Sequence, residues 1–428
     1  MKFLLITNND YDGVGQHVLR TNIYLNKINH KSKILVLHKA TDDKNVFIVK
    51  RFFLYRLYSF FLNIIKINFK DIFSFGNSTI SYKSIKKYVE DSDVLIIFSL
   101  HKILSYKDLK IILSHKKIVY FRPLDLEFAT GGCHTNFLDG NKVCRKYQDS
   151  CDNCPKLNFL DIFNIASSNL LKKKFFFQYY KPRVFVENTY TQNIYNKSLV
   201  FRKNPVQKIF LGTDSLRKKF YTKKKARKIL KIDNNKKVML FGTFNLDSHY
   251  KGALVLKESL ELLSKDLDNK NLKDVQLLTF GNKNNFYLNI KNIEWLHFGL
   301  INSDYMLNLL YRAADVLLCP SISDNGPHIV TEALLNDLPI VAFDQGVAQD
   351  IIINDINGYL ISCYDKLAFN KAILKIIFYK KFDLKNAQNK NLKNNFTDSY
   401  EINQITKYAK YDLKQQITLS KKNLKTIM

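Results

Sequence analysis

The sequence has little glycine, proline and cysteine, and few acidic residues for its length. Its 428 residues include only 14 glycines and 7 prolines, which excludes collagen-like and low-complexity classes. Six cysteines are too few for a disulfide scaffold. Because 46% of the residues are hydrophobic, the chain can bury sizeable cores, and wholesale disorder is excluded as well.

Long uninterrupted apolar runs are also lacking. The short run at Phe3–Thr7 has no small-residue cleavage site after it, so we interpret it as a buried strand rather than part of a signal peptide. The longest candidate membrane segment, around residues 47–69, falls short of the ~20 apolar residues that a spanning helix needs. It is interrupted by Lys50, Arg51, Arg56 and Lys66. We therefore expect a cytoplasmic protein.

The charge is strongly unbalanced, because 67 Lys and Arg against 38 Asp and Glu give a net charge of +29. One interpretation is an acidic partner, such as nucleic acid, an anionic membrane face or a phosphorylated substrate. The other is a compositional bias, since Lys and Asn are frequent throughout, as in Lys223-Lys224-Lys225. No helix-turn-helix, zinc-finger histidine pair or RNP-like motif supports nucleic-acid binding.

Both halves of the chain alternate short apolar strands with helices. In the first half we expect strands at Phe3–Thr7, Lys33–Leu37, Val94–Phe98 and Ile118–Phe121, with a glycine loop at 12–15 and a helix at Val18–Leu25. In the second half we expect strands at Lys237–Phe241, Val275–Phe280, Asp315–Cys319 and Pro339–Phe343, and helices at Leu254–Ser264, Asp304–Ala313 and His328–Leu335. This alternation predicts an α/β protein with two Rossmann-like, doubly wound parallel-sheet domains. We place them at residues 1–205 and 206–385, and we expect the helical tail 386–428 to pack back on the first.

The stretch 311–350 predicts an anion site. A strand ends at Pro320, a polar loop with a glycine follows, and a helix opens at Pro327, a residue favoured in the first helical position. The amide groups of a helix N-terminus attract anions, and open α/β sheets bind ligands at the carboxyl ends of their strands. Asp324 and Glu332 bracket this site, and carboxylates accept hydrogen bonds from sugar hydroxyls.

The same stretch closely resembles glycosyltransferase family 4, the retaining nucleotide-sugar transferases of GT-B architecture, in which two Rossmann-like domains face a cleft. The matching positions are Ala314-Asp315, Pro320-Ser321, Asp324, Glu332-Ala333, Leu338-Pro339 and Gly346. Asp324 stands where the family usually has Glu. The resemblance implies a UDP- or GDP-sugar donor and no cofactor for catalysis, with Asp324 on the donor sugar and Glu332 on the ribose. It also implies donor contacts from Gly242, Thr243, Asn325, Gly326, Pro327 and His328.

A lysine follows a second glycine loop. The segment Phe241-Gly242-Thr243, continued by Tyr250-Lys251-Gly252, is similar to the family's glycine loop and Lys-Gly pair. Lys251 can neutralise the diphosphate leaving group. Many members carry an Arg just after the glycine, where this chain has Thr243 and Phe244, so phosphate stabilisation depends more on Lys251 and on the helix terminus.

Residues 121–157 resemble a subgroup associated with exopolysaccharide synthesis, including the colanic-acid type. The matching positions are Asp125, Thr130-Gly131-Gly132-Cys133-His134, Cys144, Cys151 and Cys154-Pro155. Leu124 replaces a His found in many members. The resemblance implies a growing, lipid-linked polysaccharide as acceptor, near Asp125 and His134. Asp125 joins Asp324 and Lys251 as a candidate catalytic residue, and Gly13 and Gly15 occupy the place of a family loop near donor phosphate or acceptor.

Four of the six cysteines follow the pattern C-x10-C-x6-C-x2-C, at Cys133, Cys144, Cys151 and Cys154. Four thiolates at such spacing can hold a structural Zn²⁺. Alternatively they are structural cysteines, reduced or paired, although a cytosolic disulfide is disfavoured. Both alternatives stay open.

The segment Val46–Lys70 is basic and aromatic, with five Lys or Arg, eight Phe or Tyr and no acid. Helical spacing would place Arg56, Ser59, Asn63, Lys66 and Lys70 on one stripe. Such a helix can lie on an anionic membrane face, which would make the protein peripheral on the inner face of the plasma membrane. Alternatively it packs on the sheet of the first domain.

These observations predict a retaining glycosyltransferase, a hexosyltransferase acting on a nucleotide sugar and a saccharide acceptor. A phosphorylase or epimerase of the same fold is the rival enzyme, although the cysteine-rich segment is not expected there. A basic nucleic-acid-binding protein is the non-enzymatic rival.

Overall fold

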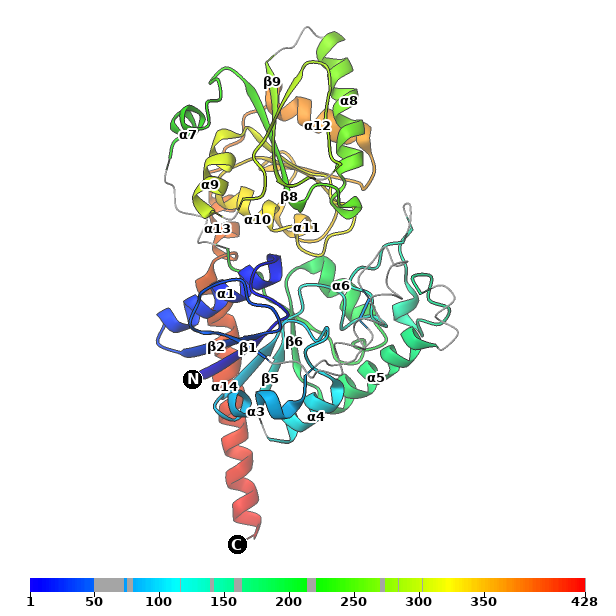
Figure 1. Ribbon diagram of the computed structural model, residues 1–428, viewed down its shortest axis with the longest axis vertical. Helices are drawn as coiled ribbons and strands as arrows, with labels where there is room; N and C mark the ends of the chain where they lie inside the picture. The colour runs from blue at the N-terminus through cyan, green and yellow to red at the C-terminus, as the bar shows by residue number, and fades with distance from the viewer. Residues whose placement is uncertain are drawn as a thin grey trace. The chain divides into compact units, whose positions relative to one another are not determined.

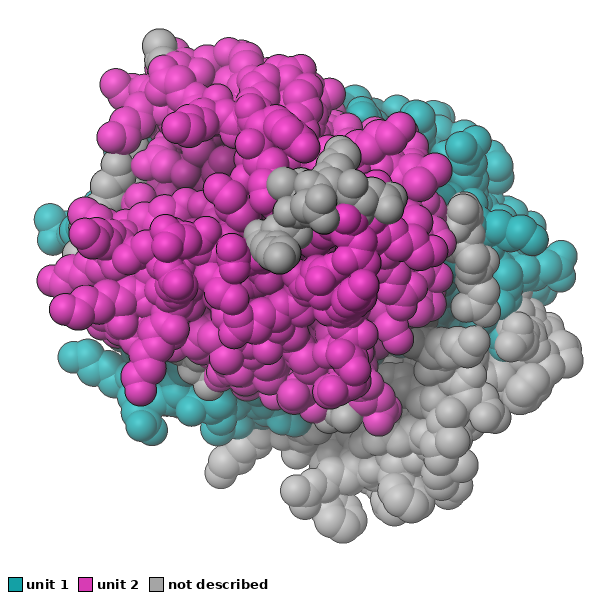
Figure 2. Space-filling view, turned by 90° about the horizontal axis from the view of Figure 1, so that it is seen from above, with its two compact units in different colours: residues 1–187, 191–212, 398–428 teal, residues 188–190, 213–397 magenta. Residues whose placement is uncertain are grey.

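The computed structural model describes residues 1–49, 73–74, 80–115, 117–138, 142–157, 164–213, 221–269, 274–283, 285–301 and 303–427. These residues form two compact units, coloured separately in Figure 2. The first unit contains residues 1–187, 191–212 and 398–428, and the second contains 188–190 and 213–397. The chain thus enters the second unit briefly at 188–190 and returns to the first for its last helix. Most of the basic segment 46–70 lies outside the described residues, so both interpretations of it stay predictions.

The first unit is built on a seven-stranded sheet in the order β3-β2-β1-β4-β5-β6-β7. Its strands, all paired in parallel, are β1 Lys2–Ile6, β2 Lys31–Val36, β3 Val46–Ile48, β4 Val94–Ile97, β5 Ile118–Phe121, β6 Arg183–Val186 and β7 Gln207–Lys208. Its helices are α1 Gly13–Lys27, α3 Tyr82–Glu90, α4 Tyr106–Ser114, the 3-10 turn η1 Lys146–Gln148, α5 Ile165–Tyr180, α6 Thr189–Lys197 and α14 Asp398–Ile427. All four residues of β4 are buried, as in sheets covered on both faces.

Helix α1 begins five residues earlier than the sequence indicates, because Asp12 caps it. The Asp12 carboxylate accepts a hydrogen bond from the Gly15 amide at 2.8 Å, which satisfies one of the unpaired donors of the first turn. Gly13 and Gly15 therefore lie inside the helix rather than in a loop before it. A Cβ at Gly15 would lie 2.6 Å from the carbonyl carbon of Asp10, so this turn requires glycine there.

Helix α14 completes the core of the first unit from the far end of the sequence. Ile402, Ile405 and Ala409 are buried with residues of the central strands. The helix packs against α1 and β5, and it is the red helix that ends the chain in Figure 1. One face of this helix is therefore part of the hydrophobic core.

The second unit is built on a six-stranded parallel sheet in the order β10-β9-β8-β11-β12-β13. Its strands are β8 Lys237–Asn245, β9 Val275–Asn282, β10 Ile293–His297, β11 Val316–Cys319, β12 Ile340–Phe343 and β13 Gly358–Ile361. Its helices are α7 Lys223–Ile229, the 3-10 turn η4 His249–Lys251, α8 Ala253–Asn269, α9 Asp304–Ala313, α10 His328–Leu335, α11 Ala348–Ile351, α12 Lys366–Leu374, the π-helical turn η5 Lys375–Tyr379 and α13 Ala387–Asn394.

Both sheets are doubly wound, which confirms the predicted fold class. In each, the chain starts at a central strand, builds outward to one edge and then continues on the other side. The order reverses between β1 and β4 in the first unit and between β8 and β11 in the second. Ligands bind at such switch points, outside the carboxyl ends of the strands. No helix in the described part of the chain is long and apolar enough to cross a lipid bilayer.

Candidate functional site

The candidate site of the second unit lies where β8 and β11 end, at the switch point of its sheet. After Cys319 the chain forms a loop, and α10 begins at His328 with Pro327 as its N-cap. Its bounds are those expected from the sequence, with Pro327 just before the first helical residue. Pro327 makes no side-chain hydrogen bond to the first turn, and the positive end of a helix attracts anions.

Lys251 and Asp324 form an ion pair at this switch point. The Lys251 Nζ lies 2.5 Å from an oxygen of Asp324. The two loops that carry them are also joined through the backbone, because the amides of Ile322 and Ser323 donate to the Tyr250 carbonyl at 2.9 and 3.3 Å. The Asp324 side chain is only 11% exposed and that of Lys251 is 34% exposed. The structure thus brings together two of the candidate residues from the sequence.

Two glycines let the surrounding loops approach one another. Gly252 has φ +75° and a Cβ there would lie 1.8 Å from the Pro320 carbonyl oxygen. Gly346 has φ +54° and a Cβ there would lie 2.5 Å from the Asp324 carbonyl oxygen. Both positions need a left-handed backbone and the space of a missing side chain, so these motif glycines shape the site through the backbone.

Gly242 and Thr243 lie inside β8, which continues to Asn245 rather than ending at Phe241. A Cβ at Gly242 would lie 2.1 Å from the ring of Phe280 on the neighbouring strand. Thr243 is 8% exposed. Close packing of β8 against β9 therefore accounts for this glycine, independently of any ligand.

Glu332 is 7% exposed and lies on α10. Its Oε2 accepts a hydrogen bond from the hydroxyl of Tyr311 at 2.5 Å. Tyr311 is buried on α9 and received no role from the sequence. Its position three residues before Ala314-Asp315 is the one local signal that could have pointed to it.

Asp315, part of the same motif, has a structural environment. Its carboxylate accepts hydrogen bonds from the Val238 amide at 2.7 Å and from the Arg227 guanidinium at 2.9 Å. These contacts fix the start of β8 against α7. The motif therefore combines residues that hold the sheet with residues that face the site.

The short segment 188–190 supports the site from a distant part of the sequence. The Asn188 side-chain amide donates to the carbonyl of Asn325. The backbone amide and the hydroxyl of Thr189 donate to the Asp350 carboxylate at 2.7 and 2.5 Å. Nothing in the local sequence of 188–190 indicates this role.

In the first unit, Asp125 and His134 lie together. The Asp125 Oδ2 is 2.6 Å from the His134 Nδ1. Burial disfavours the charged imidazole, but the carboxylate of Asp125 outweighs it and raises the pKa of His134 above its usual value. The hydroxyl of Ser74 lies 2.8 Å from His134 Nε2 and 2.7 Å from His101 Nδ1. Sequence reasoning selected Asp125 and His134 and missed His101.

The four cysteines of the first unit line one small cavity of about 20 Å³, although they are spread over 22 residues of sequence. Contact with the Cys154 thiol and burial raise the pKa of Cys133, and burial raises the pKa of Cys151 to about 12. Without a metal these two thiols are therefore protonated at neutral pH. Within the described ranges, no three of the sulfurs belong to a group of metal-ligating atoms that all lie within 4.8 Å, and zinc binding by the cysteines stays a prediction.

Comparison with known proteins gives a family match in the second unit. Residues 222–395 match the family described as glycosyl transferases group 1. No curated protein matches the chain in a sequence comparison.

Solved structures resemble the chain over nearly its whole length. A glycosyltransferase from Rickettsia africae is 15% identical, with a TM-score of 0.61 and coverage of 96% of this chain and 98% of that one. Anabaena HepE, in complex with UDP and glucose, is 14% identical, with a TM-score of 0.61 and coverage of 95% and 99%. WaaG, a glycosyltransferase involved in lipopolysaccharide biosynthesis, is 15% identical, with a TM-score of 0.58 and coverage of 95% and 98%. At these identities the likeness shows a shared fold.

The two doubly wound sheets, the whole-length likeness to GT-B structures and the family match in the second unit agree with one another. Residues 222–395 form a group 1 glycosyltransferase domain, and the chain is a glycosyltransferase of the GT-B fold.

Proposed function

We propose that this glycosyltransferase is a retaining enzyme that transfers a sugar from UDP- or GDP-sugar to a growing, lipid-linked cell-surface polysaccharide. The observation that carries the proposal is the Lys251–Asp324 pair beside the N-terminus of α10, inside the matched domain. HepE was solved with UDP-glucose and WaaG takes part in lipopolysaccharide biosynthesis. Both are consistent with a nucleotide-sugar donor and a surface-glycan acceptor.

Lys251 and the helix terminus supply the electrostatic part of the reaction. A nucleoside diphosphate leaves with negative charge, and a lysine held beside a helix N-terminus stabilises that charge as it develops. Lys251 is paired with Asp324 at 2.5 Å. The diphosphate competes for Lys251, and the Asp324 carboxylate then accepts hydrogen bonds from the donor sugar.

Glu332 is proposed to hold the ribose. Tyr311 fixes one carboxylate oxygen of Glu332, and the carboxylate keeps further acceptor capacity for ribose hydroxyls. Gly242, Thr243, Asn325, Gly326, Pro327 and His328 complete the proposed donor site. Asp125 and His134, together with Gly13 and Gly15, are proposed on the acceptor side.

The test begins with nucleotide binding and release. UDP or GDP should protect the protein from thermal unfolding, and one nucleotide sugar should yield free nucleotide in the presence of acceptor. Protection by duplex DNA but by neither nucleotide would contradict the proposal and favour nucleic-acid binding.

A matched pair of lysine variants tests the site. Lys251→Gln should lower turnover by about 10- to 150-fold, because a hydrogen bond to a charged group contributes roughly 1.5–3 kcal/mol. Lys257→Gln, on the exposed face of α8 in the same segment, should leave turnover unchanged. Equal turnover in both variants would remove Lys251 from the mechanism.

A structural role for the four cysteines is part of the proposal, either with Zn²⁺ or as reduced thiols. They share one cavity, and four thiolates around one zinc would close its coordination shell and hold the loop. Metal analysis of protein purified without chelator, compared with a Cys151→Ser/Cys154→Ser double variant, separates the two alternatives. Unchanged metal content and melting temperature in the double variant would contradict the zinc site.

A further inference from the structure

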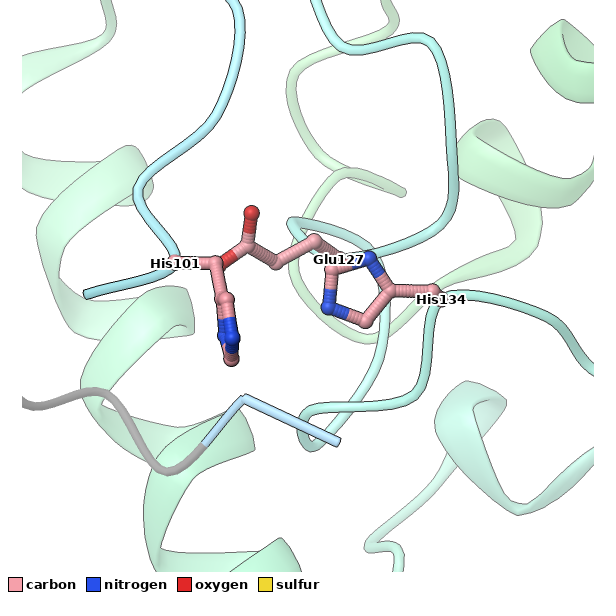
Figure 3. A group of neighbouring side chains, drawn as sticks. All are labelled: His101, Glu127 and His134. Atoms are coloured by element: carbon pink, nitrogen blue, oxygen red, sulfur yellow. The ribbon is translucent and has the colours of Figure 1, made fainter. Parts of the chain in front are cut away.

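A second group of metal-ligating side chains lies in the first unit, apart from the cysteines. His101, Glu127 and His134 each offer one ligand atom, and these atoms all lie within 4.8 Å of one another. Figure 3 shows the three side chains projecting toward one another from separate stretches of the chain. In the described parts of the chain this is the one group of three or more such residues at that spacing.

The three residues lie in the segments that follow two neighbouring strands. His101 follows β4, and Glu127 and His134 follow β5, and these strands pair in parallel. Their carboxyl ends therefore meet at one edge of the sheet, where open α/β folds bind ligands. Glu127 is 4% exposed, so its carboxylate lies inside the protein and needs compensation for its charge.

The surroundings hold two of the three side chains in place. The Nδ1 of His134 lies 2.6 Å from the Asp125 carboxylate, a carboxylate–histidine pair of the kind that orients the other ring nitrogen toward a metal. The Glu127 carboxylate accepts hydrogen bonds from the Ser99 hydroxyl at 3.1 Å and from the Leu100 amide at 3.2 Å. These contacts restrain the ligands before any ion binds.

We propose that His101, Glu127 and His134 form a binding site for one divalent first-row transition ion, with Zn²⁺ as the representative. Imidazole suits these ions, and two histidines with one carboxylate are a known zinc ligand set that leaves further coordination positions open. The Ser74 hydroxyl lies 2.7 Å from His101 Nδ1 and 2.8 Å from His134 Nε2, so its oxygen can fill one such position. His134 and its partner Asp125 are also proposed on the acceptor side, but ion binding is measured without donor or acceptor, so its test does not depend on the proposed function.

The ion would join the loops that follow β4 and β5. The same region is also held by Lys173, which is buried and donates to the carbonyls of Glu127 and Thr130. A metal with two imidazoles and a carboxylate would neutralise the buried Glu127. The expected consequence is a more stable first unit when the ion is bound.

Metal titration of the full-length protein tests the site. Protein stripped with chelator should bind Zn²⁺ in competition with a chromophoric chelator, and the ion should raise its melting temperature. His101→Ala and His134→Gln should each weaken binding more than about 100-fold, the upper end of what loss of a supporting residue costs. His115→Ala, which removes an exposed histidine at the end of α4, should bind as the parent does.

Cobalt distinguishes this site from the cysteine cavity. Co²⁺ bound to imidazole and carboxylate gives a visible spectrum without an intense sulfur-to-cobalt charge-transfer band. The Cys151→Ser/Cys154→Ser double variant should therefore retain this spectrum, and His101→Ala should lose it. A sulfur-to-cobalt band that accounts for all the bound ion and disappears in the cysteine variant would overturn the proposal.

A supporting variant covers the case in which a ligand variant fails to fold. Asp125→Asn keeps all three ligands and should weaken Zn²⁺ binding by about 10- to 100-fold. Unchanged affinity in every folded variant would overturn the site. The same follows if stripped parent protein binds no ion, because His101, Ser74 and His134 would then form a hydrogen-bonded chain without a metal.

Discussion

Single side-chain contacts decide which carboxylates of this glycosyltransferase can meet a ligand. Glu332 and Asp315 lie 17 positions apart in the matched domain, and both are held by hydrogen bonds. Asp315 is engaged by a backbone amide and an arginine that belong to the frame of the sheet. Glu332 has one oxygen bound by Tyr311, which orients the carboxylate at the end of the sheet where a ribose is proposed.

Tyr311→Phe should weaken donor binding. Removing the hydroxyl leaves a buried carboxylate oxygen without this donor, at a cost of roughly 1.5–3 kcal/mol. If Glu332 binds the ribose, part of this cost appears as a higher dissociation constant for the nucleotide, measured by calorimetry. Tyr305→Phe, on the exposed side of the same helix, is the control. Equal nucleotide affinity in both variants would contradict the role of Tyr311.

Helix α14 is joined to its unit by a buried charge network. Oε1 of Glu401 accepts hydrogen bonds from the Arg122 guanidinium at 2.9 and 3.1 Å and lies 3.1 Å from Nε2 of His17. Its Oε2 accepts one from the Gly212 amide at 2.7 Å. Arg122 and Glu401 are both at most 2% exposed, so each depends on the other for compensation of its charge.

Glu401→Gln should destabilise the first unit by about 3–5 kcal/mol, because it leaves the Arg122 charge buried without its partner. Hydrogen exchange should show the loss in the central strands of that unit. Glu90→Gln, at an exposed surface pair, should change the free energy of unfolding by less than about 1 kcal/mol. If the free energies of unfolding of the two variants differ by less than about 1 kcal/mol, the network contributes little to the stability of the first unit.

The same network makes acid stability depend on Glu401. Burial disfavours the ionised carboxylate, but the charges of His17 and Arg122 outweigh it and lower the pKa of Glu401 to about 2. A carboxyl group with a depressed folded-state pKa stabilises the protein above its unfolded value, near 4.5, and this contribution is lost as the pH falls from there toward 2.

The free energy of unfolding of the parent, measured with urea, should therefore fall between pH 4.5 and 2. The free energy of unfolding of Glu401→Gln should fall less over the same range. Parallel curves for the two proteins below pH 4.5 would contradict the assignment.

At the scale of the whole molecule, the path of the chain affects folding, and the net charge affects binding to anionic surfaces. The first unit includes residues 398–428 from the end of the chain, and the second unit includes residues 188–190 from its middle. Folding of both units therefore depends on contacts between distant parts of the sequence, which cost loop-closure entropy. The net charge of +29 adds attraction to anionic surfaces.

The protein should bind vesicles that contain anionic lipid and release them in high salt. Each Lys or Arg near such a surface contributes about 1 kcal/mol, so the five cations of residues 46–70 can hold the protein reversibly. Replacing Arg51, Arg56 and Lys66 with Gln should weaken co-sedimentation while activity on a soluble acceptor persists.

Neutral vesicles are the control for this measurement. Equal pelleting of the triple variant and the parent would assign the attraction to charge elsewhere. No pelleting of the parent would favour a core helix in this segment.

Much of the fold and half of the site could be read from local patterns. Short apolar runs such as Val94–Ile97 and Ile340–Phe343 predict buried parallel strands, because a strand that is covered on both faces is apolar throughout. In the loop and helix at 320–335, proline, glycine and carboxylates lie within a few residues of one another. The local sequence was therefore enough to propose a site there. The start of α1 was misplaced because Asp12, rather than the glycines, sets the end of the loop.

The sequence by itself determined the two doubly wound sheets, since these depend on periodicity. Its resemblance to a known family indicated the class of enzyme and the residues proposed around Asp324 and Lys251. Only the tertiary structure decided that Tyr311 holds Glu332, that Asn188 supports the loop at Asn325, and that His101 and Glu127 meet His134. These contacts join strand ends that are neighbours in the sheet but far apart in the chain. Which residues meet there depends on strand order and packing, which no local pattern encodes.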